Sequence, residues 1–243
     1  MEEKDERAIR LEQVNYVVDG RHILKNITGS FTKGAITTVV GPSGAGKTTL
    51  FRLCNGLKSP SAGEIYIFEK AISRYHPVEL RRDVGVALQK APMIDGSVRK
   101  NLALPLTLQK KSLSEEDAKE LMDVVGLDKR FLDRNSKDLS GGERQKLSIA
   151  RTLVNRPRVL LLDEITSSLD RVSQQDIEEL ILQINRRYGA TVIWITHDLE
   201  QALTVGEYTW VIMDGELIEA GKSDLLRHPK NDKVKRFVKG EVR

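Results

Sequence analysis

The most constraining feature of this 243-residue chain is a glycine-rich stretch with fixed spacing, Gly41-Pro42-Ser43-Gly44-Ala45-Gly46-Lys47-Thr48. A strand-like apolar run over residues 35–40 precedes it, and residues 47–57 follow with the apolar spacing of a helix. Between a strand and a helix, such a stretch curls so that its backbone N–H groups point inward, beside the positive end of the helix. The stretch therefore predicts a phosphate-binding loop of the P-loop type.

The side chains that end this loop have distinct expected roles. Lys47 should reach the β- and γ-phosphates of a nucleotide, and the Thr48 hydroxyl should ligate Mg²⁺. Thr49 comes next, and we expect it to assist through phosphate contacts. We therefore assign every residue from Gly41 to Thr49 to nucleotide binding.

A pair of acidic residues ends another apolar strand. The run over residues 158–162 leads directly into Asp163 and Glu164. Because ligands of open α/β sheets bind beyond the carboxyl ends of the strands, both acids should face the nucleotide. We expect Asp163 to hold Mg²⁺, directly or through water, and Glu164 to act as general base toward the attacking water.

Strand-like runs alternate with amphipathic helical runs, which favours an α/β fold with a mixed or largely parallel central sheet. The strand pattern recurs over residues 9–15, 22–31, 35–40, 84–88, 159–162 and 191–195. Asp19-Gly20 forms a turn signal between the first two runs, so we expect a smaller antiparallel or mixed sheet near the N-terminus. Residues 170–187 form the strongest helical pattern, with an apolar face of Ile177, Leu180, Ile181 and Ile184.

Strand signals are absent from about residue 91 to residue 155, which predicts an all-helical insertion. Ser114 is the expected N-cap of an amphipathic helix over 114–125, with acids in its first turn, where the helix dipole favours them. We interpret 1–243 as a single domain. Its expected parts are the P-loop core with the β subdomain (about 9–90 and 156–226), the helical subdomain (about 91–155) and a basic C-terminal tail (about 227–243), loosely held over 233–243.

Composition narrows the classes of protein that fit. The chain is 40% hydrophobic and 30% charged, and its net charge of +4 is spread among charges of both signs, so we expect a solvated surface and no nucleic-acid partner. Cys54 is the only cysteine; it excludes an internal disulfide, and we expect it to be buried. Residues 1–7 are too charged for a signal peptide, and no apolar run approaches the ~20 residues of a membrane helix. Action at a membrane would therefore require docking on a membrane partner.

The segment Leu139-Ser140-Gly141-Gly142-Glu143 precedes a helical run over 144–154. A serine cap followed by two glycines exposes a helix N-terminus that can bind an anion. With this segment the chain resembles the nucleotide-binding subunits of ABC transporters, whose signature motif reads Leu-Ser-Gly-Gly-Gln in many members. Glu143 is a variant of its last position, and the resemblance extends over about residues 9–226.

The resemblance implies an ATPase that binds ATP and Mg²⁺ and is peripheral to the membrane, on its cytoplasmic face. It implies a head-to-tail dimer of two copies, with Ser140, Gly141 and Gly142 contacting the γ-phosphate that the other copy holds. It also implies an integral-membrane permease as a second partner. Hydrolysis would open the dimer, and the permease would follow that motion.

Three further residues match positions of the family. Gln89 ends the strand over 84–88 and matches the glutamine that senses Mg²⁺ and water. Asp170 matches the aspartate that crosses the dimer interface. His197, after the strand over 191–195, matches the histidine that orients the base and the water. The resemblance thus implies a catalytic set of four residues: Lys47, Gln89, Glu164 and His197. It also implies that Gln89 contacts the metal.

Departures from the family pattern leave two questions open. The family's adenine-stacking aromatic residue aligns with Val18, while Tyr16 lies two residues earlier on the same strand face, so either could meet the base, or neither. Ile165 stands where many members have proline. This variant, together with Gly96-Ser97-Val98-Arg99-Lys100-Asn101-Leu102-Ala103-Leu104-Pro105, resembles a bacterial subgroup associated with metal export, iron in particular. Phosphate and other small-solute importers are the alternative.

The membrane partner should dock near Gln89 and residues 91–108. The apolar residues there line a groove, form the core of the helical part, or do both: Met93, Ile94, Leu104 and Leu106. A different class of function is a soluble ABC ATPase of an assembly machinery, which the length of the chain does not exclude. A nucleotide-binding module without catalysis is disfavoured, because Glu164 and His197 are both present.

Overall fold

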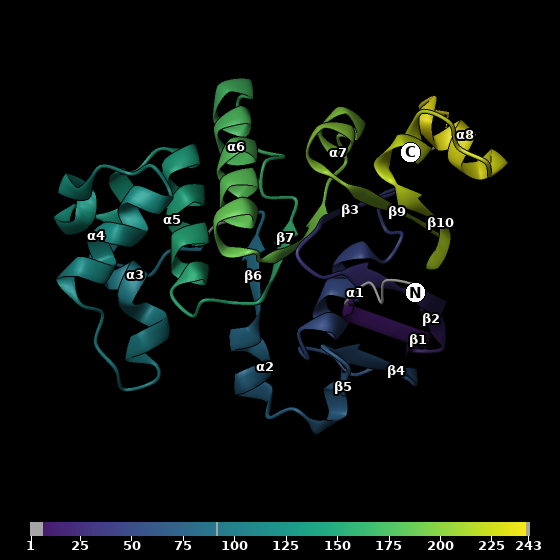
Figure 1. The fold of residues 1–243 in the computed structure, drawn as a ribbon, viewed down its shortest axis with the longest axis horizontal. Coiled ribbons are helices and arrows are strands. Elements are labelled where there is room, and N and C mark those ends of the chain that lie inside the picture. The colour runs from purple at the N-terminus through teal and green to yellow at the C-terminus, as the bar shows by residue number, and fades with distance from the viewer. Residues whose placement is uncertain (1–6, 91, 242–243) are drawn as a thin grey trace, which may run out of the picture.

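The computed structural model describes residues 7–90 and 92–241, which form two sheets surrounded by helices (Figure 1). The smaller sheet is antiparallel and has the order β2-β1-β4-β5. Its strands are β1 (Arg7–Val18), β2 (Arg21–Thr32), β4 (Ala62–Ile67) and β5 (Lys70–Ala71). Asp19 and Gly20 both have positive φ, 48° and 74°, which suits the tight turn between β1 and β2. The antiparallel sheet predicted near the N-terminus is confirmed.

The central sheet has the order β10-β9-β3-β8-β7-β6 and is parallel except for β10. Its strands are β3 (Ile36–Val40), β6 (Val84–Leu88), β7 (Val159–Asp163), β8 (Thr191–Ile195), β9 (Tyr208–Met213) and β10 (Glu216–Lys222). Every residue of β3, β7 and β8 is buried, because helices cover both faces of such a sheet. The mixed central sheet is therefore also confirmed.

The helices that flank the sheets are α1 (Lys47–Cys54), α2 (Pro77–Asp83), α6 (Arg171–Tyr188), α7 (Leu199–Val205) and α8 (Asp232–Val238), with short 3₁₀ turns at Ile72–Arg74 and Ser223–Leu226. The predicted apolar face of α6 is buried along its whole length. α1 is shorter than predicted. It ends at Cys54 because Asn55 caps it, Gly56 has a φ of 67°, and Leu57 is 59% exposed.

Between β6 and β7 the described residues form helices and turns, with one isolated β-bridge between Ser97 and Asn135. The helices and turns are α3 (Val98–Thr107), α4 (Glu115–Val124), α5 (Gly141–Leu153) and 3₁₀ turns at Lys129–Asp133 and Ser136–Asp138. Ser114 caps α4 as predicted, since its hydroxyl accepts a hydrogen bond from Asp117 N. In Figure 1 these helices gather at one end of the molecule, beside α6.

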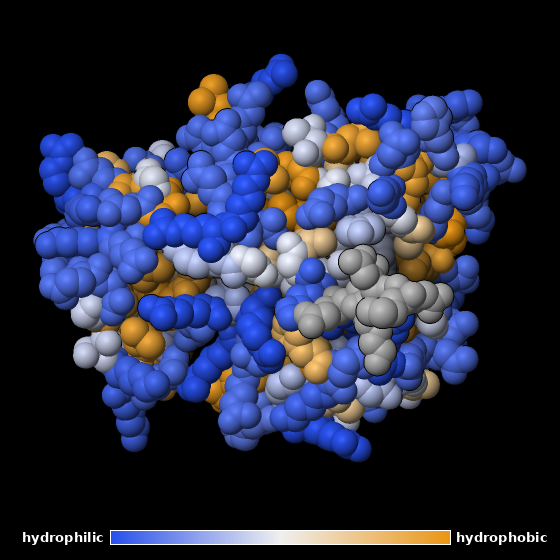
Figure 2. Space-filling model, in the orientation of Figure 1, coloured by the Kyte–Doolittle hydropathy of each residue, from blue (hydrophilic) through white to orange (hydrophobic). Residues whose placement is uncertain are grey.

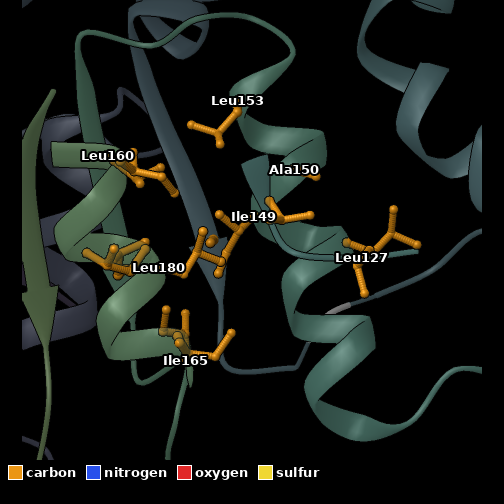
Figure 3. Close-up of a cluster of buried hydrophobic side chains, with 14 of the residues drawn as sticks. Leu127, Ile149, Ala150, Leu153, Leu160, Ile165 and Leu180 are labelled. Carbon is orange, nitrogen blue, oxygen red and sulfur yellow. The ribbon is translucent and has the colours of Figure 1, made fainter. Parts of the chain in front are cut away.

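The helical part shares one hydrophobic core with the central sheet. Figure 3 shows Leu127 and Ile149 of the helical part in the same cluster as Leu160 of β7 and Leu180 of α6. All four side chains are at most 5% exposed. Separation of the helical part from the sheet would expose this packed core. A rotation of the helical part would therefore have to preserve the packing.

The expectation of a loosely held C-terminal segment is wrong for its described residues. Residues 232–238 form α8, and Val234 is fully buried beside Leu226 and Met213. Phe237 and Val238 pack on the same cluster, so apolar residues at helical spacing fix the segment. The first six residues, on which the expectation about a signal peptide depends, lie outside the described residues.

The surface in Figure 2 is mainly hydrophilic, with apolar patches of limited extent. Over residues 7–90 and 92–241, no helix combines the length and the apolar character that crossing a bilayer requires. Cys54 is buried, as expected, and burial raises the pKa of its thiol to about 12.

Candidate functional site

The residues predicted to act on a nucleotide gather at one edge of the central sheet. Leu88 of β6 is opposite Asp163 of β7, and Asp163 is opposite Ile195 of β8. Ile195 in turn is opposite Val39 of β3. Because the four strands are parallel and in this register, the residues that follow them emerge side by side. This edge therefore carries the P-loop, Gln89, the acid pair and His197.

Lys47 is held inside the P-loop by the loop itself. Its side chain is 5% exposed, and Nζ donates hydrogen bonds to the carbonyl oxygens of Gly41 (2.7 Å) and Pro42 (2.8 Å). Burial lowers the pKa of Lys47, while the nearby Glu164 and Asp163 counteract this. A buried cation that donates its hydrogen bonds to neutral carbonyls is well placed to receive an anion.

Two glycines of the P-loop are required by neighbouring backbone. Gly41 has a φ of 147°, and a Cβ at this position would lie 1.9 Å from the carbonyl oxygen of Ile212 in β9. Gly46 has a φ of 99°, and a Cβ there would lie 2.9 Å from the carbonyl oxygen of Ile23 in β2 and 2.7 Å from the Leu24 side chain. Gly44 has a φ of 77° with nothing within 4 Å of a Cβ. Close packing against β9 and β2 thus sets the shape of the loop.

Thr48 and Asp163 bring a hydroxyl and a carboxylate together. Thr48 Oγ1 donates to Asp163 Oδ1 over 3.2 Å, and Asp163 is 9% exposed. Burial is the main reason why the pKa of Asp163 is raised. Both groups present oxygen donors, as Mg²⁺ prefers, and nucleotide phosphates and water would complete its shell. The pair fits the predicted metal position.

Glu164 contacts His197 directly. Glu164 Oε1 and His197 Nε2 are 2.5 Å apart, and the two side chains are 20% and 44% exposed. Glu164 has a φ of 52°, which is unusual for a residue with a long side chain. This backbone conformation, at the exit of β7, turns the carboxylate toward the loop that follows β8. The structure thus brings together the predicted base and the predicted histidine.

Hydrogen bonds that the sequence did not predict hold these loops in place. Gln89 Nε2 donates to Ser167 Oγ (2.9 Å), which connects the end of β6 to the loop after β7. Gln201, 2% exposed on α7, bonds to Thr166 and donates to Glu178 of α6 over 2.7 Å. A glutamine at a core-facing position of a helix is the signal that could have revealed this network.

The signature segment is a well-formed helix start. Ser140 Oγ accepts from Glu143 N (3.2 Å), and Glu143 Oε2 accepts from Ser140 N (2.7 Å), a complete capping box. A Cβ on Gly141 would contact only Leu169, and one on Gly142 only Ser173. No atom of the P-loop, which the structure describes completely, lies within 4 Å of either position. Gly141 and Gly142 therefore lie beside Leu169 and Ser173, on either side of Asp170 in the sequence, and not against the P-loop of their own chain.

Asp170 caps the helix next to the signature segment. Its carboxylate accepts hydrogen bonds from Ser173 N (3.0 Å) and Ser173 Oγ (2.7 Å), and these bonds lower its pKa. Ser173 is the same residue that a Cβ on Gly142 would contact. Asp170 and Gly142 are thus neighbours on an exposed face of the molecule.

The two candidates for adenine stacking have different surroundings. Tyr16 packs on the core of the small sheet, and Lys58 Nζ donates to its hydroxyl (2.6 Å) while lying 4.7 Å from its ring centroid. Val18, at the end of β1, is 38% exposed. Tyr16 therefore has a structural role, and Val18 is the more accessible of the two.

Comparisons with known proteins agree with this geometry. The family model described as ABC transporter matches residues 24–167. A putative ABC transporter ATP-binding protein, YjkB of Bacillus subtilis, is 42% identical over 97% of this chain and 95% of its own length. CbiO1 of Clostridium perfringens, described as part of the ABC transporter complex cbiONQ, has a TM-score of 0.84 with 28% identity, covering 95% of this chain and 94% of its own.

A second solved structure is the ATP-binding cassette MJ0796, as a dimer in a post-hydrolysis state with ADP and Pi. Its TM-score is 0.77 with 31% identity, and the match covers 88% of this chain and 98% of that one. Residues 24–167, which the family model matches, include the P-loop, the acid pair and the signature segment. The chain therefore belongs to the ABC transporter family and is an ATP-binding, ATP-hydrolysing subunit of that family.

Proposed function

We propose that two copies of this chain form a head-to-tail dimer around two ATP–Mg²⁺ and drive a separate membrane permease. One observation carries the proposal: no atom of the P-loop of its own chain lies within 4 Å of a Cβ placed on Gly141 or Gly142, the two glycines of the signature segment. In a two-fold dimer, each signature segment can face the P-loop of the other copy. The dimeric state of the similar cassette MJ0796 supports this arrangement.

Each side chain at the sheet edge has a role in the proposed reaction. Lys47 exchanges the carbonyls of Gly41 and Pro42 for phosphate oxygens. Glu164 accepts a proton from the attacking water as the water oxygen bonds to the γ-phosphorus. The bond from that phosphorus to the bridging oxygen breaks, and its electron pair leaves with ADP. His197 orients Glu164 through the 2.5 Å contact. Mg²⁺, held near Thr48 and Asp163, would neutralise phosphate charge.

ATP binding closes the dimer because each nucleotide then contacts two subunits. Loss of the γ-phosphate removes the contact between the P-loop of one copy and Ser140 of the other. The equilibrium therefore moves toward the open dimer after hydrolysis, and the permease follows that change.

A groove between the sheet and the helical part is the proposed permease contact. A cavity of about 440 Å³ lies between α2, β6, α3 and α5. Its apolar lining residues are Val78, Val86, Leu104, Pro105 and Leu108. Leu108 and Val78 are 78% and 43% exposed, so apolar surface faces solvent here. Leu104 lines this groove, Leu106 lines a different cavity, and Met93 packs on the core.

The charged residues that line the groove indicate what kind of partner segment it binds. The groove is also lined by Arg81, Arg82 and Arg151, and none of these forms an ion pair with another described residue. Burial lowers the pKa of Arg151, so its charge is partly desolvated without compensation. An acidic side chain on an amphipathic segment would satisfy it. The proposed occupant is a cytoplasmic helix of the permease that carries an acidic residue, and this contact holds the chain at the cytoplasmic face of the membrane.

Affinity purification from detergent-solubilised native membranes tests the permease proposal. Tagged Glu164→Gln protein with ATP should recover a stoichiometric multi-span membrane protein. Adding Arg151→Glu should reduce that recovery about tenfold or more, because the new carboxylate would repel the acidic residue of the permease helix. Arg186→Glu, the same charge change on an exposed residue of α6, should leave recovery unchanged. Recovery of only soluble partners would favour an assembly ATPase instead.

For the cargo, we propose a metal ion, iron first, moved outward. Support comes from Ile165 after the acid pair and from the segment over residues 96–105, which resemble the metal-exporting subgroup. Cells that lack the subunit should accumulate iron when external iron is high, and Lys47→Ala should not restore normal levels. Reduced phosphate uptake with unchanged cellular iron would favour an importer.

A further inference from the structure

Ser167 lies between the glutamine at the end of β6 and the proposed base after β7. Its hydroxyl accepts a hydrogen bond from Gln89 Nε2 (2.9 Å) and donates one to the carbonyl oxygen of Glu164 (2.9 Å). We propose that Ser167 is a positioning residue that transmits the position of Gln89 to Glu164. The inference rests on the proposed role of Glu164 as general base.

The backbone of Glu164 needs external support, because its φ of 52° is sparsely populated by residues with long side chains. Its N–H donates to the carbonyl of Ile195 (3.1 Å), and its own carbonyl accepts from Ser167 N (3.1 Å) as well as from Ser167 Oγ. Ser167 therefore supplies two bonds to the peptide that aims the carboxylate. Removal of the hydroxyl leaves the backbone bond and takes away the link to Gln89.

The other end of this connection reaches the signature helix. Gln145 lies on α5, three residues after Gly142, and is 3% exposed. Its Nε2 donates to the carbonyl oxygen of Leu88 (3.3 Å), the residue that precedes Gln89. A displacement of α5, whose first turn holds the signature segment, therefore shifts the end of β6 and with it Gln89. Ser167 carries that shift to the peptide of Glu164.

This connection gives a physical reason for hydrolysis to depend on dimer closure. Ser140 and Gly141 of the signature segment are exposed, and Ser140 would contact a phosphate held by the other copy. Such a contact would move α5 as a rigid helix, because a packed core does not deform continuously. The base would then be aligned only in the closed dimer, which limits hydrolysis in separated subunits.

Steady-state ATP hydrolysis by the purified full-length chain tests the inference. Ser167→Ala should lower kcat about fivefold, as loss of one hydrogen bond does, with little change in KM for ATP. Ser167→Thr keeps the hydroxyl and should restore most of the rate. Thr204→Ala removes a hydroxyl that also donates to a backbone carbonyl, Glu200 O (2.8 Å), on α7, and should have no effect.

A double variant identifies the path. If Ser167 acts through Gln89, then Gln89→Ala with Ser167→Ala should be no slower than Gln89→Ala alone. The inference is overturned if Ser167→Ala has the normal rate, if the two losses multiply, or if threonine fails to restore the rate. Glu164→Gln in the same assay separates the proposed general-base role of Glu164 from the proposed positioning role of Ser167. Normal turnover by Glu164→Gln would refute the base, whereas its inactivity with negative Ser167 results would refute only this inference.

Discussion

The P-loop edge and the signature segment are both suited to bind phosphate, yet their surroundings differ. At the P-loop edge, hydrogen bonds already join the parts: Lys47 to its own loop, Thr48 to Asp163, and Glu164 to His197. These groups come from separate segments of the chain. The edge therefore gathers the residues proposed to bind the nucleotide and those proposed to transfer a proton.

In the proposed site, the signature segment contributes only a place to bind phosphate. Ser140 bonds to Glu143 within its own capping box, and a Cβ placed on Gly141 or Gly142 would meet Leu169 or Ser173. Under the proposed arrangement, a single chain therefore holds two unequal halves of an ATP site, and a second copy is needed to join them.

The largest effect should come from the P-loop edge. Glu164→Gln should lower turnover by about 10²–10⁴-fold, as loss of a general base does, while ATP is still bound. The variant should therefore accumulate as an ATP-dependent dimer. Size-exclusion chromatography with light scattering, with and without ATP, measures this together with the hydrolysis rate. Normal turnover would remove Glu164 from the role of base.

Glycine-to-alanine changes should lower the free energy of unfolding much more in the P-loop than in the signature segment. Gly41→Ala should lower the free energy of unfolding by about 3 kcal/mol or more, because its Cβ would lie 1.9 Å from Ile212 O at a φ of 147°. Gly141→Ala should change it by less than about 0.5 kcal/mol, since its Cβ would meet only Leu169, at 3.7 Å. Denaturant unfolding measures both. Equal losses would mean that the P-loop does not need its close contact with β9.

Two serine caps should have similar effects on stability and different effects on dimer formation. Ser140→Ala and Ser114→Ala each remove an N-cap hydrogen bond, which costs about 1 kcal/mol. Only Ser140→Ala should weaken the ATP-dependent dimer of the Glu164→Gln background. An equal effect of Ser114→Ala on dimer formation would show that the defect reflects helix stability alone.

The smallest effect should be the pH dependence at Asp170. Its pKa is lowered by the bonds from Ser173, so the folded state favours the carboxylate. The stability that Asp170 contributes should be complete above its unfolded pKa of about 3.9 and should disappear as the pH falls through the lower folded value. The stability difference between the wild type and Asp170→Ala, measured without nucleotide, should therefore shrink toward acid pH. A difference that grows toward acid pH would contradict this assignment.

Sequence reasoning located the strand ends because each motif combines a local pattern with a required context. Asp163 could be placed from the sequence because ligands of such sheets bind beyond the carboxyl ends of the strands, while Gln89 and His197 were assigned by resemblance to the family. The parallel register explains why all three emerge at one edge. Ser140 could be placed as a cap because capping depends only on nearby residues.

Features that depend on distant contacts could not be predicted in this way. Tyr16 has a structural role because of Lys58, which follows 42 residues later. Ser167 matters through Gln89, and α8 is ordered because Val234 packs beside Leu226 and Met213. The need for glycine at position 41 could not be predicted for the same reason, since it comes from the backbone of Ile212 on β9.

Mixing two inactive variants determines whether two copies share each ATP site. Lys47→Ala damages the P-loop only, and Gly141→Asp places a carboxylate where a phosphate should bind, at a helix start that tolerates an acid. A mixed dimer would contain one intact site, so equal amounts should recover up to about a quarter of wild-type hydrolysis. If the activity of the mixture stays at the average of the separate variants, each chain must complete its own site, and the account is contradicted.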